Sequence, residues 1–507
     1  MNNDATKDEG RALGEKDTEL LNKLLPYFND EELSAIDKLS SKLYTIFSSS
    51  GPASSRKVLV AYGGGKDSSY TVAFVRLLQL KLLERYGETF IMRVGSMRHG
   101  GVPQAVMDNI DRVYRRLGLY GDDRAELLVI DHNHVSTFER DLPMPQEVLD
   151  INRTDILMNG HRTAGDGRPT FCNSCNLSVA NFYGLACWYD GGVDVVFTGD
   201  SKEEQRQYYK WIMGMGSHIG LNIREHRSKG FHGLLQILND IGQKYFHEMF
   251  GRGSEEECQK REIAFGNSEK LPEFVTIYDD VSYRVDDHWP LISEFLGFEF
   301  DELAFSFTES DCANPALMAH LRGLKAAHVE GTDYYTGISE YLQLATQLMK
   351  KKEIPGELQE LVLKRYKDKD AIDRTKAKIT EFAWQAFGLT EANMIAMVST
   401  PLVNEGQYLE PWLGQNHKDL FPCIEELRAI LEGRGVNSPE QSTLVAELED
   451  IVGLPLRQMQ SLYHNTRVDF GDRGTVVSLI RWDDPHKQTI RFVDKNNREF
   501  EEEISGR

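Results

Sequence analysis

Short apolar segments alternate with helical patterns along the first two thirds of the chain. The apolar segments predicted as strands are residues 58–61, 90–94, 127–130, 193–197 and 274–277. Between them, apolar residues recur at helical spacing, most clearly over residues 68–85, 103–117 and 177–189. Short apolar strands alternating with helices are typical of a parallel sheet covered on both faces. The pattern therefore predicts an α/β fold.

Helical patterns flank this predicted sheet. Residues 1 to about 17 form a polar tail, and residues 19–47 predict two amphipathic helices. After residue 331 the pattern is mostly helical, over residues 338–352, 355–367, 371–386, 422–433 and 439–451. Residues 475–480 and 489–493 predict a small C-terminal β-hairpin. The expected domains are a tail and helical segment (1–52), the sheet domain (53–330), a helical domain (331–470) and the hairpin segment (471–507).

Composition narrows the class of protein. The 507 residues suffice for two or three domains, and a 40% hydrophobic content allows sizeable cores. The net charge of −21 opposes binding to a phosphate backbone, so a small molecule is favoured over a large nucleic acid. Neither a membrane span nor a signal peptide is evident, which predicts a cytoplasmic protein with reduced thiols.

A glycine-rich turn follows the first predicted strand and opens a predicted helix. It reads Gly63-Gly64-Gly65-Lys66-Asp67-Ser68-Ser69. Glycines let backbone N–H groups approach phosphate oxygens, and a helix start adds unpaired N–H groups. Lys66 can neutralise phosphate charge, and Asp67 can hold Mg²⁺. The simpler alternative is a connecting turn whose serines cap the helix; the spacing is neither that of a Walker loop nor that of a Rossmann fingerprint.

This loop resembles that of the PP-loop ATP pyrophosphatases, whose motif is Ser-Gly-Gly-x-Asp-Ser, with Gly63 here in place of the first serine. The resemblance implies an ATP site between the ends of the first and fourth predicted strands. Thr198-Gly199-Asp200 after the fourth strand is similar to the family's second nucleotide loop. That stretch alone could also be a helix start with acidic residues in its first turn. The implied catalytic residues are Lys66, Asp67 and Asp200, and Gly63, Gly64, Gly65, Ser68, Ser69, Thr198 and Gly199 would bind ATP.

Three of the six cysteines form a candidate metal site. Cys172 and Cys175 make a CxxC pair between the third and fourth predicted strands, and Cys312 follows the fifth. They could hold an iron–sulfur cluster, a zinc ion with a further ligand such as Cys187, Cys258 or a histidine, or serve as a redox dithiol. Cys312 could also be simply buried. The remaining cysteine, Cys423, and the histidines at 132, 134 and 161 are interpreted as structural.

The order of these motifs is similar to that of the PP-loop tRNA thiolases over residues 56–326. The resemblance implies a [4Fe–4S] cluster on Cys172, Cys175 and Cys312, with ATP and Mg²⁺ as further requirements. It implies an ATP-dependent sulfur transferase that adenylates an acceptor oxygen and uses a sulfur donor or carrier. The charge favours a small molecule or nucleobase over tRNA as acceptor. Nitrogen transfer and a non-enzymatic nucleotide-binding role are the alternatives, and a homodimer is one expected assembly.

Overall fold

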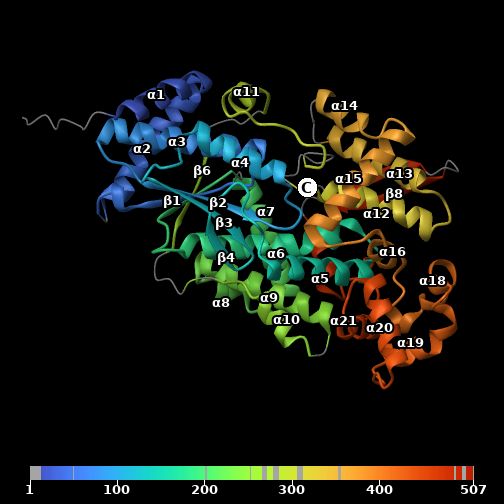
Figure 1. Ribbon diagram of the computed structural model, residues 1–507. Helices are drawn as coiled ribbons and strands as arrows, with labels where there is room; N and C mark the ends of the chain where they lie inside the picture. Colours follow the sequence, from blue (N-terminus) through green and yellow to red (C-terminus); the bar gives the residue numbers. More distant parts are fainter. Residues whose placement is uncertain are drawn as a thin grey trace, which may run out of the picture.

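A mostly parallel sheet formed by residues 57–276 organises the fold. In the computed structural model the described residues are 13–49, 51–199, 202–251, 253–264, 266, 271–277, 285–304, 312–351, 356–482, 484, 487–493 and 498–505. Figure 1 shows a sheet with helices on both faces, and a large helical region beside it. In the described part of the chain, no helix is long and apolar enough to cross a bilayer.

The main sheet has the order β4-β3-β2-β1-β5-β6. Its strands are β1 (Lys57–Ala61), β2 (Ile91–Arg98), β3 (Ala125–Asp131), β4 (His134–Thr137), β5 (Val195–Thr198) and β6 (Glu273–Thr276). All neighbours pair in parallel except β4, which is antiparallel to β3. The five predicted strands are confirmed within a few residues. The sequence analysis missed β4, because neither face of this short strand is buried and no apolar pattern marks it.

Alternate residues of β1 pack against different layers of helices. Val58 and Val60 face a core shared with α1 (Glu15–Leu24), α2 (Asp30–Ser48), α3 (Lys66–Tyr86) and α4 (Gln104–Arg116). Leu59 faces the opposite core, which includes residues of α6 (Gly167–Trp188). Both faces of the central strand are therefore dry, as a parallel sheet requires.

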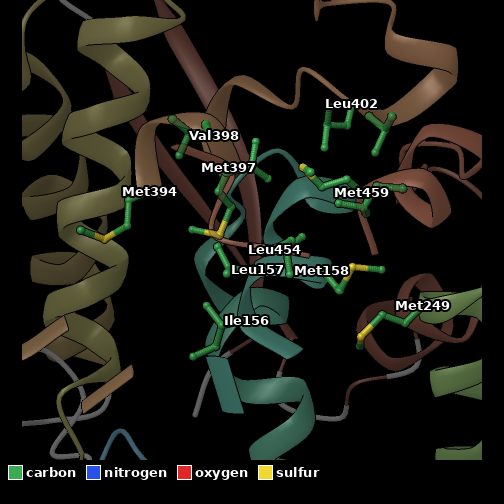
Figure 2. Packing of buried hydrophobic residues seen from close by; sticks show 14 of the residues in the cluster. Ile156, Leu157, Met158, Met249, Met394, Met397, Val398, Leu402, Leu454 and Met459 are labelled. Atoms are coloured by element: carbon green, nitrogen blue, oxygen red, sulfur yellow. The ribbon is translucent and has the colours of Figure 1, made fainter. Parts of the chain in front are cut away.

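Helices after residue 313 share a core with α5 (Gln146–Thr163) and α9 (Gly230–Phe250). Figure 2 shows Met158 of α5, Met397 of α16 (Glu391–Ser399) and Met459 of α21 (Leu456–His464) gathered in this core. Gly160 lets α5 approach α16 closely, since an added Cβ would lie 1.9 Å from the Met397 sulfur. The domain limits placed at residues 52, 330 and 470 stay predictions.

The helical segments predicted after residue 331 are confirmed. α12 (Asn314–His328) precedes them, and the helices after residue 331 include α13 (Tyr334–Lys351), α14 (Gly356–Lys364), α15 (Lys369–Phe387), α17 (Val403–Gly406), α18 (Leu409–Asn416), α19 (Ile424–Leu431) and α20 (Pro439–Val452). The remaining helices lie around the sheet and its connections: α7 (Lys202–His218), α8 (Ile223–Arg227), α10 (Glu255–Lys260) and α11 (Val285–Pro290).

The C-terminal hairpin exists, but one of its predicted strands is wrong. Its strands are β7 (Lys487–Val493) and β8 (Glu499–Ser505), which pair antiparallel. Residues 476–480 instead lie in α22 (Val476–Trp482). Thr475 precedes that helix, and its hydroxyl oxygen accepts a hydrogen bond from the Ser478 backbone N–H at 3.1 Å. This capping contact, and packing of α22 on α9, outweigh the β-branched composition.

Candidate functional site

The glycine loop connects β1 to α3 at the carboxyl end of the sheet. Gly64 has φ +84°, and a Cβ there would lie 2.6 Å from Val106 Cγ1. Glycine is therefore required both by the backbone conformation and by the close approach to α4. Gly65 is the N-cap of α3, so the first-turn N–H groups that lack intrahelical partners lie at the end of this loop.

The charged side chains of the loop lie against each other. Lys66 is buried, and its Nζ is 2.9 Å from Asp67 Oδ1. The Asp67 side chain is 55% exposed, so its carboxylate remains accessible from solvent. A cation and a carboxylate at a helix start can respectively neutralise a phosphate and hold Mg²⁺.

The two serines of the loop differ in their surroundings. Ser68 is half-buried and donates to the Gly65 carbonyl at 3.2 Å. Ser69 is fully buried, donates to the same carbonyl at 2.7 Å, and lies 3.0 Å from the Tyr62 hydroxyl. The Ser69 hydroxyl therefore holds the loop to the end of β1.

The predicted second loop begins at the end of β5. β1 pairs with β5, in the register Val58↔Val195, so Thr198 and the glycine loop lie at one edge of the sheet. Thr198 is buried and Gly199 is exposed. Asp200 lies outside the described residues. The chain runs outward from β1 in both directions, through β2 and β3 and then through β5 and β6, and such a switch point is where doubly wound sheets bind ligands.

The three predicted cysteines come from two separate parts of the chain. Cys172 and Cys175 lie in the first turns of α6, three residues apart and therefore on neighbouring positions of one face. Cys312 immediately precedes Ala313, whose N–H donates to the Gly101 carbonyl at 2.8 Å. Gly101 belongs to the loop after β2, so the third cysteine is held at the carboxyl edge of the sheet. Asn314 joins the two parts, with Nδ2 3.7 Å from Cys172 Sγ.

Electrostatic interactions link the three thiols to Arg168. Burial raises the pKa of Cys175 well above its ordinary value, and negative charge on Cys312 and Cys172 raises that pKa further, while Arg168 opposes the rise. Burial alone would lower the pKa of Arg168, but the thiolates and Asp484 raise it above the ordinary value. Cys172 is buried, Cys175 and Cys312 are half-buried, and the charges of residues 137 positions apart thus act on one guanidinium.

The three cysteines, all of which the structure describes, do not form a closed metal site. Among the residues that the structure describes, no three His, Cys, Asp or Glu side chains are arranged to hold a metal ion. A zinc ion requires four ligands, each about 2 Å from the metal, and the arrangement does not fit such a closed site. A four-iron cluster is a larger body whose thiolates bind separate irons. The charges of Cys172, Cys175 and Cys312 act on one another, and a [4Fe–4S] cluster on these three thiols stays a prediction.

The other cysteines and histidines lie apart from this cluster. Cys187 is buried in the core under the sheet, where burial raises its pKa to about 12. Burial also lowers the pKa of His161 to about 3. His132 Nε2 lies 2.6 Å from the Lys260 carbonyl, in a structural contact. These surroundings agree with the structural interpretation.

A cavity of about 770 Å³ lies beside the site. Its wall includes Thr198 at the second loop and Arg168 at the thiol cluster, with residues of α6, α7, α9 and α22 between them. The sequence analysis missed this cavity, because no local pattern identifies a wall built from four distant helices.

Comparison with known proteins gives no match, whether with family profiles, curated proteins or solved structures.

Proposed function

We propose that the protein is an ATP-dependent sulfur transferase that adenylates an acceptor oxygen and replaces it with sulfur. The observation that carries the proposal is a cavity whose wall contains both Thr198, at the end of β5, and Arg168, whose charge interacts with the three thiols. ATP chemistry and sulfur chemistry would then occur on one bound acceptor, without its release between steps.

The glycine loop supplies the nucleotide end of this proposal. The first-turn N–H groups of α3 donate to phosphate oxygens, and Lys66 neutralises their charge. Asp67 would hold Mg²⁺ through its exposed carboxylate, and the ion would neutralise charge on the leaving pyrophosphate. The acceptor oxygen attacks the α-phosphorus, the bond between the α and β phosphates breaks, and pyrophosphate leaves. AMP is then a good leaving group on the acceptor carbon.

The cysteines supply the sulfur end. Cys172, Cys175 and Cys312 would hold a [4Fe–4S] cluster, which when bound presents a soft metal that can carry sulfide. Sulfide from a donor or carrier forms the new carbon–sulfur bond, and the carbon–oxygen bond to AMP breaks. Arg168 balances the negative charge that three thiolates bring into a buried place.

Product analysis tests the proposal. Wild-type protein, reconstituted without oxygen, should convert ATP to AMP and pyrophosphate in the presence of acceptor, and Asp67→Asn should stop this while the circular dichroism spectrum stays unchanged. For a Cys312→Ser variant tested in the same assay, Cys423→Ser, at another half-buried cysteine, is the matched control. Release of ADP and phosphate would refute adenylation. An acceptor whose mass shows nitrogen in place of oxygen would instead support the amidotransferase.

A further inference from the structure

The wall of the cavity carries more positive than negative side chains. Among its described lining residues, five are cationic and only Asp484 is acidic, in a chain whose net charge is −21. The cations are Arg168, Lys202, Arg206, Lys210 and Arg481. Three of them are spaced by four residues on α7, so they form a stripe along one face of that helix. The stripe is exposed, and although Arg206 Nη1 lies 3.7 Å from Glu203 Oε2, the excess of cations in the cavity wall favours an anionic ligand.

The interior of the cavity is apolar and rich in aromatic rings. Leu177 of α6 and Leu235 of α9 line it together with Phe231, whose ring lies 4.7 Å from that of Phe274. α7 covers this interior, yet only Met215 and Gly216 of its 17 residues are buried. Its Tyr209 lines the cavity and remains 37% exposed. An aromatic ligand would complete the burial of this helix.

Two residues of the cavity wall carry buried donor atoms. Within the described part of the chain, Asn173 Nδ2 and Trp211 Nε1 have no hydrogen-bond partner, although both residues line the cavity and Asn173 is only 4% exposed. An unsatisfied buried N–H group is costly, and a ligand oxygen would satisfy it. Asn173 lies between the two cysteines of the CxxC pair, so an oxygen held there would be next to the thiol cluster.

We propose that this cavity is the acceptor pocket and that the acceptor is a small aromatic carboxylate. Its ring packs on the apolar interior, the α7 cations attract its charge, and its carboxylate oxygens accept hydrogen bonds from Asn173 Nδ2 and Trp211 Nε1. A volume of about 770 Å³ suits a small molecule of this kind. That the ligand is the acceptor of the reaction rests on the proposed function, whereas its binding chemistry is argued from the cavity alone.

Calorimetric titration of the reconstituted protein, without ATP, tests the pocket with 2-naphthoate and its neutral analogue 2-naphthamide. Naphthoate should bind about fivefold more tightly than the amide, and the double variant Arg206→Gln/Lys210→Gln should remove that preference. Lys38→Gln, at an exposed lysine on α2, is the control and should keep it. Failure of naphthoate to bind, or a preference that survives the double variant, would overturn the inference.

The two buried donors are tested separately. Trp211→Phe keeps the ring but removes the N–H, and should weaken naphthoate binding about tenfold. Trp188→Phe removes another buried, unpartnered indole N–H, on a tryptophan that does not line the cavity, and should have no effect. Asn173→Leu should weaken binding similarly, with its folding checked by thermal unfolding. Equal affinity in Trp211→Phe and wild type overturns the hydrogen-bonding assignment even if Asn173→Leu does not fold.

The proposed pocket and the proposed reaction can be refuted independently of each other. Loss of adenylation, seen as ADP and phosphate in place of AMP and pyrophosphate, refutes the proposed function and leaves the binding results standing. AMP formation that continues in a protein unable to bind naphthoate refutes the pocket and leaves the proposed function standing.

Discussion

Gly64→Ala is the sharpest test of the glycine loop, because the structure separates two costs at this position. The residue has φ +84°, which an L-residue adopts at a cost of about 1–2 kcal/mol. The added Cβ would also lie 2.6 Å from Val106 Cγ1 and 3.0 Å from Ile110 Cγ1. Both side chains are buried in α4, and overpacking of this kind costs about 1–3 kcal/mol. The sum predicts a destabilisation of about 2–5 kcal/mol.

Gly121→Ala is the matched control. Gly121 has φ +71°, but an added Cβ there meets no atom within 4 Å. This variant therefore carries only the conformational cost of about 1–2 kcal/mol. Urea unfolding followed by fluorescence should place wild type, Gly121→Ala and Gly64→Ala in descending order of midpoint. ATP affinity, measured by calorimetry, should fall at least about tenfold in Gly64→Ala, since the first turn of α3 is displaced, and stay unchanged in Gly121→Ala.

A double-mutant cycle isolates the clash. Val106→Ala removes the contacted methyl, so it should recover part of the stability lost in Gly64→Ala, with a coupling energy of about 1–3 kcal/mol. If Gly64→Ala is as stable as Gly121→Ala and binds ATP normally, the loop does not pack on α4 as described, and its role as a preformed phosphate site is refuted.

Four further outcomes are expected. Cys312→Ser should lower the iron content after anaerobic reconstitution while ATP affinity survives; full iron content would exclude the three-cysteine site. Arg168→Met removes the cation that opposes the raised pKa of Cys175, so in metal-free protein alkylation of Cys175 should require a still higher pH, as peptide mass spectrometry at several pH values can show. Gly63→Ser adds the hydroxyl that the PP-loop motif carries and should tighten ATP binding by about two- to tenfold in the same calorimetric assay. Binding to bulk tRNA should be weak and should fall steeply with salt in filter binding, and a tight complex at physiological salt would contradict the small-molecule acceptor.

Local pattern predicted those parts of the fold where one kind of interaction dominates. Strands β1, β2, β3 and β5 are mostly buried, and the apolar residues that this burial requires are evident in the sequence without a structure. β4 is exposed and left no such pattern. Residues 475–480 were misread because Val476 and Val477 favour a strand locally, whereas packing on α9 and the Thr475 cap decide for a helix.

Part of the candidate site could likewise be predicted from local sequence, and part could not. The glycine loop is one contiguous segment, so its candidate phosphate-binding residues could be predicted from the sequence. Cys172 and Cys312 could be associated only through resemblance to other proteins, and their shared interaction with Arg168 emerges from the packing of α6 beside α12. Asn173 and Trp211 carry no sequence signal at all. Their significance lies in unpaired donors and a common cavity, which are properties of the folded chain.

The distance along the chain between the thiols has a consequence for biosynthesis. Cys312 follows Cys175 by 137 residues. At the usual pace of translation, the CxxC pair leaves the ribosome on the order of ten seconds before its third partner. The Ala313–Gly101 hydrogen bond that anchors this partner joins a late segment to one made much earlier. A nascent chain thus presents Cys172 and Cys175 before Cys312, so the proposed cluster could assemble only after residue 312 has been made and its segment has joined Gly101.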